Sequence, residues 1–167
     1  MNNIEIAKEI RSAIKKDDIE KVKELIENNI EMLNWMTPFG TWLHVAATHG
    51  KFEIVKYCIE MGMNINDKGD ISDSGAINSA ASEGHYEIVK YLISCGAELD
   101  VSEPDKNPLF SAIYGGHKEI VELLLEKGID ASIRYSGENM TNMSAYDFAI
   151  ERGEIDIANM LKLHGNK

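Results

Sequence analysis

The sequence carries an internal repeat with a fixed spacing, and this repeat constrains the fold more than any other feature. Each copy has a marker residue, Gly or Asp, with Ala four residues before it and Gly or Asn twelve residues after it. The markers are Asp17, Gly50, Gly84, Gly116 and Gly153, so that successive copies are 33, 34, 32 and 37 residues apart. A period in this range predicts a solenoid of stacked supersecondary units. Such a stack offers an extended surface, not a deep chemical pocket.

Apolar positions counted from the marker predict two helices in each unit. After the marker, positions 5, 8 and 9 are apolar in every copy except at Lys162, and these spacings share one helix face. Position 3 is always acidic, which suits a first turn because the helix dipole and its free N–H groups attract a carboxylate. Before the marker, an apolar stripe with an invariant Ala predicts a shorter helix in close contact with its neighbours. Neither helix can bury its stripe alone, so the units must stack.

Several strings within the repeat resemble the ankyrin repeat family. TWLHVAATHG at 41–50 follows that family's T-P-L-H-x-A-A pattern, with Trp42 in place of Pro. NPLFSAIYGG at 107–116 and SAYDFAIERG at 144–153 are weaker copies, in which Phe110 and Asp147 replace the motif His, as Asn78 does in the third unit. The resemblance implies an all-α, ankyrin-type solenoid of about five stacked helix-turn-helix units with short hairpin-like connecting turns. Its concave side, formed by turn tips and first helices, is where family members usually bind proteins.

The repeat divides one expected domain, 1–167, into units of about 4–35, 36–68, 69–102, 103–133 and 134–167. The first unit has Asp17 at its marker and charged Glu9 and Arg11 in its first helix, so we expect it to cap the stack. The last connection is longer than the others, and the sequence leaves open whether the insertion at 133–143 is ordered. Insertions in repeat proteins map to one face, which is often the binding face.

The composition disfavours nucleic acid and a membrane as partners. The chain has 17 basic and 28 acidic residues, a net charge of −11, whereas phosphate binding requires clustered Lys and Arg. This charge favours a basic partner or serves only solubility. No signal peptide and no apolar run of about 20 residues is present, so we expect a cytoplasmic chain, monomeric when unbound. Its thiols are then expected to be reduced, with Cys58 at a core position and Cys95 exposed.

The two positions before each marker differ in every unit, although the Ala two residues earlier never changes. They hold Lys15 and Lys16, Thr48 and His49, Ser82 and Glu83, Tyr114 and Gly115, and Glu151 and Arg152. The resemblance places them on the concave face. They are candidate binding residues, or they are solvated positions that drift without function.

Two connections are acidic, and the few aromatic residues cluster near connections. Segments 67–75 and 98–107 are expected to form one negative ridge that speeds the capture of a basic partner, or an ordinary solvated charge run. Trp and Tyr are common interface anchors, but Trp42 fills a motif position and is expected to pack. The predicted partner-binding residues are Trp35, Phe39, Thr48, His49, Asp70, Asp73, Ser82, Glu83, Glu103, Asp105, Tyr114, Tyr135, Glu151 and Arg152.

No pattern in the sequence predicts catalysis or a cofactor. His85 and His117 follow the marker at a family-typical position and His44 is the motif His, which leaves His49 and His164 without metal-ligand spacing. We therefore expect a protein-binding module that is not an enzyme. One hypothesis is an immunity protein that neutralises a toxin domain, because the chain is small, acidic and consists of repeats alone. The alternatives are an effector or regulatory adaptor that recruits a cellular protein, and a structural or homo-oligomeric role.

Overall fold

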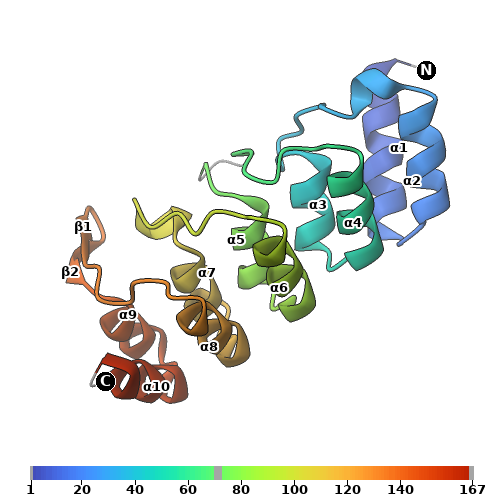
Figure 1. Ribbon diagram of the computed structural model, residues 1–167. Coiled ribbons are helices and arrows are strands. Elements are labelled where there is room, and N and C mark those ends of the chain that lie inside the picture. The colour runs from blue at the N-terminus through green and yellow to red at the C-terminus, as the bar shows by residue number, and fades with distance from the viewer. Residues whose placement is uncertain (1, 70–72, 166–167) are drawn as a thin grey trace.

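The computed structural model describes residues 2–69 and 73–165. In it, the chain folds into antiparallel helix pairs that stack side by side (Figure 1). The first helices of the pairs are α1 (Asn3–Lys15), α3 (Trp42–Thr48), α5 (Ala76–Ser82), α7 (Pro108–Tyr114) and α9 (Ala145–Arg152). The second helices are α2 (Ile19–Glu27), α4 (Phe52–Glu60), α6 (Tyr86–Ser94), α8 (Lys118–Glu126) and α10 (Ile155–Gly165). The predicted helical solenoid is confirmed.

Short elements mark the connections between pairs, which project along one side of the stack (Figure 1). They include two 3₁₀ turns, η1 (Ile30–Met32) and η2 (Pro104–Lys106), and two short strands, β1 (Tyr135–Gly137) and β2 (Met140–Met143). The strands pair antiparallel, with Tyr135 opposite Met143. The insertion at 133–143, which the sequence left open, is therefore a β-hairpin.

Side-chain caps begin several of the first helices. Asn2 and Glu5 form a reciprocal capping box on α1, and Ser144 and Asp147 form one on α9. At α3, His44 Nδ1 accepts from the Thr41 hydroxyl and backbone N–H at 2.9 and 3.3 Å, while His44 Nε2 donates to the Ser74 carbonyl at 3.2 Å. This one imidazole therefore caps its own helix and ties it to the next connection.

In the third and fourth units, the residue after the marker reaches back to the preceding unit. His85 Nε2 donates to the Thr48 carbonyl at 3.0 Å, and His117 Nε2 donates to the Ser82 carbonyl at 2.9 Å. Gly84 has a φ of +82°, and a Cβ there would lie 2.5 Å from the His117 ring. Glycine is therefore favoured at position 84 for two reasons: the backbone makes a left-handed turn there, and His117 from the next unit approaches closely.

The core runs without interruption through the stack. The invariant Ala of each unit is buried, as predicted, and lets neighbouring helices approach closely. Trp42 is fully buried and its Nε1 donates to the Met32 carbonyl at 2.7 Å, which confirms its expected packing role. Cys58 is buried and Cys95 is exposed, as predicted. Among the described residues, no helix is both long enough and apolar enough to cross a bilayer.

Candidate functional site

The variable positions before the marker meet across unit boundaries. Thr48, Ser82 and Glu83 line one hollow of about 280 Å³ that runs along α5 from Ser74, in the connection, to the turn before α6. Its remaining walls are Asn78, Ser79 and Ser111, so the surface is mainly hydroxyl and amide. Such groups provide hydrogen bonds without a strong charge. The structure therefore brings three predicted residues from two units into one polar groove.

The variable positions of the last two units also meet. The guanidinium of Arg152 lies 4.2 Å from the centroid of the Tyr114 ring, and its Nη2 donates to the Tyr114 carbonyl at 3.2 Å. Tyr114 remains 58% exposed, and Glu151 beside this pair is also exposed. Stacking on Arg holds the phenol ring in a defined orientation. Two more predicted residues, from units four and five, are thus one surface feature.

At the first unit the strip is basic. Burial lowers the pKa of His49, and the nearby charges of Lys15, Arg11 and Lys51 lower it further, while Glu83 acts in the opposite direction. His49 therefore lies between a group of cations on α1 and the polar groove on α5. We use the name groove strip for Lys15, Lys16, Thr48, His49, Ser82, Glu83, Tyr114, Gly115, Glu151 and Arg152.

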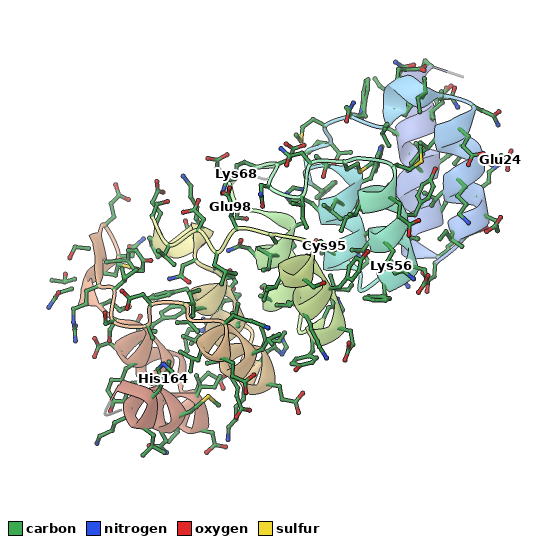
Figure 2. All side chains as sticks on the ribbon, in the orientation of Figure 1. Glu24, Lys56, Lys68, Cys95, Glu98 and His164 are labelled. Carbon is green, nitrogen blue, oxygen red and sulfur yellow. The ribbon has the colours of Figure 1, made fainter. Side chains whose placement is uncertain are left out.

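The acidic connections lie against one another, and lysines bridge them. Lys68 Nζ lies 2.8 Å from an Asp100 carboxylate oxygen, and Lys106 Nζ lies 3.4 Å from Asp73 and 3.2 Å from Glu103. The hydrogen bonds from Lys68 and Ser102 hold the pKa of Asp100 well below its usual range. Figure 2 shows Lys68 and Glu98 next to each other on the projecting connections. These ion pairs thus neutralise part of the negative charge that we expected on the ridge.

Carboxylates still outnumber lysines at these tips. Asp73, Glu103 and Asp105 are exposed, and the first two keep more than 60% of their side-chain surface in solvent. Asp70, which we also predicted to bind, lies outside the described residues. The exposed part of the ridge remains negative, as a basic partner would require.

Two aromatic residues from the first connection border a separate hollow of about 390 Å³ beside α1. Trp35 is half-buried against the core, whereas Phe39 is 51% exposed. The Arg11 guanidinium lies 3.8 Å from the centroid of the Phe39 ring. This hollow is apart from the polar groove on α5.

Tyr135 is a correction to the predicted surface, because it is buried. Its hydroxyl donates to the Val101 carbonyl at 2.7 Å and accepts from Asn107 Nδ2 at 3.0 Å. Its ring packs edge-on against Phe110, with 5.1 Å between centroids. The hairpin places the ring against the third connection, at 97–107, so that Tyr135 links the last two units. We therefore leave Tyr135 out of the candidate surface.

Sequence reasoning missed two sets of residues. The first comprises Ser79 and Ser111, five residues before the marker, where Ser12 also stands, so the recurrence of serine was a usable signal. The second comprises Lys8 and Arg11, which share a face of α1 with Lys15. Their spacing of three and four residues indicates one helix face, but the expectation of a wet cap obscured it.

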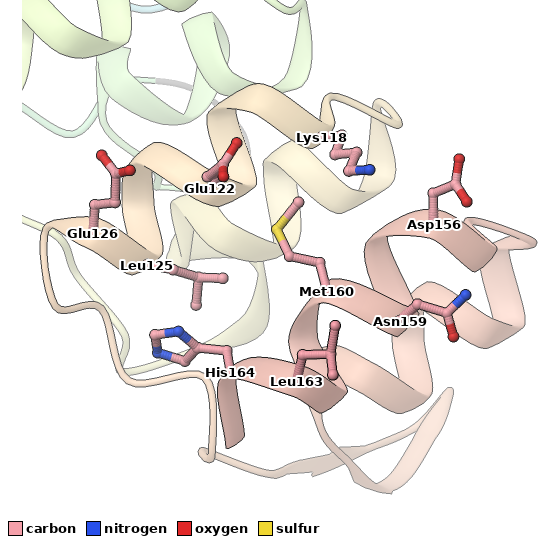
Figure 3. A pocket seen from close by; sticks show the side chains of 9 residues that line it. All are labelled: Lys118, Glu122, Leu125, Glu126, Asp156, Asn159, Met160, Leu163 and His164. Atoms are coloured by element: carbon pink, nitrogen blue, oxygen red, sulfur yellow. The ribbon is translucent and has the colours of Figure 1, made fainter. Parts of the chain in front are cut away.

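A larger hollow, of about 640 Å³, lies between the second helices α8 and α10 (Figure 3). Glu122, Glu126 and Lys118 border it from α8, and Met160 and His164 border it from α10. No predicted residue lines it. In the described ranges, no three His, Cys, Asp or Glu side chains are grouped so that they could hold a metal ion. The hollow carries no recognisable chemistry.

Comparison with known proteins agrees with this architecture. The model for ankyrin repeats (three copies) matches residues 10–103 and again residues 77–167, which together span nearly the whole chain. A search of curated proteins gives no match. Ankyrin repeats are generally protein–protein interaction modules and typically non-catalytic scaffolds. By its repeat, its stacked helix pairs and this match, the chain belongs to the ankyrin repeat family.

Proposed function

We propose that the groove strip, with the polar hollow on α5 at its centre, is the surface through which this chain binds its partner protein. The observation that carries the proposal is that variable residues from neighbouring units meet in two features of the groove strip. Thr48, Ser82 and Glu83 share a hollow, and Arg152 stacks on Tyr114. Both features are built from positions that differ between units, on a scaffold rigid enough to place functional side chains together.

The partner we propose is a toxin domain that carries a basic surface, and the chain is its immunity protein. The net charge of −11 and the exposed carboxylates of Asp73, Glu103 and Asp105 support a basic partner. Opposite charges speed association and orient the encounter. The polar groove then supplies the short-range hydrogen bonds that set specificity.

Co-expression with the product of the neighbouring gene tests this function. The wild-type chain should restore growth if that product is a toxin, and it should co-purify with it. Ser82→Arg should abolish both effects by filling the hollow, whereas Ser94→Arg, the same change on the exposed side of α6, should abolish neither. A partner that is bound but not toxic would indicate an adaptor instead. Equal behaviour of the two variants would exclude the groove as the binding surface.

The acidic connections are tested by rapid-mixing kinetics with the captured partner. Raising the salt concentration from about 50 to 500 mM shortens the Debye length several-fold, so that the association rate constant should fall sharply while dissociation changes less. An association rate constant that does not depend on salt would refute the contribution of the acidic ridge.

A further inference from the structure

We infer that the exposed face of α1 is a second contact surface, and that it takes an acidic segment of the partner that also carries an apolar anchor residue. This inference rests on the proposed function, since it names the chemistry of the partner at one end of the groove strip. The surface consists of two adjoining hollows that share Lys8 and Arg11. We call it the α1 surface.

One half of the α1 surface is apolar. Ile4 and Ala7 of α1 face Trp35, Met36 and Phe39 of the first connection across a hollow of about 390 Å³. Three of these side chains are unusually open for apolar residues: Ile4 is 62% exposed, Met36 52% and Phe39 51%. An apolar cluster of this kind at the edge of a groove suits a large aliphatic or aromatic anchor from a partner.

The other half of the α1 surface is basic. Lys8, Arg11, Lys15 and Lys16 border a second hollow together with Ser12. Six lysines elsewhere form ion pairs, as Lys68 does with Asp100, whereas none of these four neighbouring cations forms one in the part of the chain that the structure describes. Four unpaired cations on one face are conspicuous in a chain with an excess of eleven negative charges.

Arg11 connects the two halves and fixes their geometry. Its guanidinium stacks on the Phe39 ring, and its Nε is buried without a hydrogen-bond partner in the described residues. Stacking orients the guanidinium beside the apolar hollow, and no carboxylate among the described residues forms an ion pair with it. A carboxylate next to an apolar anchor would supply the missing counter-charge at that position.

The spacing of the cations defines the segment further. Lys8 and Lys15 are seven residues apart, which is about 10 Å along a helix. An extended partner segment advances about 3.3 Å per residue, so acidic residues three apart would meet both lysines. We favour an acidic protein segment over nucleic acid because a phosphate backbone offers no apolar anchor to the apolar half.

Fluorescence anisotropy with a labelled 12-residue peptide, a Leu–Phe pair followed by Glu residues every third position, tests the α1 surface directly. The wild-type chain should bind the peptide, and Lys8→Glu combined with Lys15→Glu should weaken binding by about tenfold or more. The double variant Lys23→Glu and Lys90→Glu makes the same change in net charge on the second helices and should bind within about twofold of the wild type. Circular dichroism confirms that both variants remain folded.

Three further probes separate the possible sources of binding. Phe39→Ala should weaken binding of this peptide but not binding of a poly-Glu peptide of equal charge, because only the first peptide contacts the apolar half. In NMR titrations the pKa of His49 should rise when the peptide binds, since anionic residues oppose the effect of Lys15 and Arg11. Failure of the wild type to bind the peptide, equal binding by both double variants, or equal competition by a 12-residue oligo-dT would overturn the inference.

The captured partner distinguishes this inference from the proposed function. Ser82→Arg should abolish binding of the partner but not binding of the acidic peptide, because the polar groove and the α1 surface are separate. If Ser82→Arg loses the partner but the Lys8→Glu and Lys15→Glu variant binds it normally, the α1 inference fails and the proposed function stands. If the groove variant retains the partner, the proposed function fails whatever the peptide does.

Discussion

Replacement of Gly84 by Ala tests how the units are joined. Gly84 has a φ of +82°, where an L-residue costs about 1 kcal/mol more than glycine. The added Cβ would also lie 2.5 Å from the His117 ring, so the imidazole must move away from the Ser82 carbonyl to which it donates at 2.9 Å. Loss of that hydrogen bond costs about another 1 kcal/mol. We therefore expect Gly84→Ala to lower the free energy of unfolding by about 2 kcal/mol.

Gly96 supplies the matched control. It has a similar φ of +90° but nothing within 4 Å of an added Cβ, so Gly96→Ala should cost only the backbone term, about 1 kcal/mol. Urea unfolding followed by circular dichroism measures both values. His117→Ala combined with Gly84→Ala should destabilise less than the sum of the single changes, because the clash has gone. If Gly84→Ala and Gly96→Ala destabilise equally, the contact between units is not as described.

Three further outcomes follow from individual side chains. Tyr135→Phe should lower the free energy of unfolding by about 1–3 kcal/mol, measured by urea titration, because it leaves the buried Asn107 with one partner fewer, and it should leave partner affinity unchanged. Iodoacetamide should label one thiol in the folded chain and two in urea by mass spectrometry, because burial raises the pKa of Cys58 to about 12 while Cys95 is exposed. Because the pKa of Asp100 is lowered in the folded chain, its carboxylate stabilises the fold at pH values above its unfolded pKa, near 4. As the pH is lowered below about 4, the urea concentration at the unfolding midpoint should therefore decrease, and this decrease should be smaller in Asp100→Asn.

The fold could be predicted in detail because a repeat reports the same physical constraint five times. An Ala that must fit between helices, an apolar stripe and an acidic first turn recur at set positions, and each has a local or nearest-neighbour cause. The same comparison separated the positions before the marker from the scaffold, and it assigned Trp42 and Cys58 to the core. These properties depend on contacts that every unit makes with the next.

Only the tertiary structure decided what the variable residues do, because their neighbours come from other units. Tyr135 looked like an exposed anchor, but the hairpin buries it against Val101 and Asn107, about 30 residues away in sequence. The sequence predicts a negative ridge, but only the structure places Lys68 against Asp100 of the adjacent connection. Arg11 looked like part of a wet cap, yet it stacks on Phe39 beside an apolar hollow. The sequence by itself determined the scaffold, since repetition exposes local rules, whereas the surface depends on distant pairings that no repeat records.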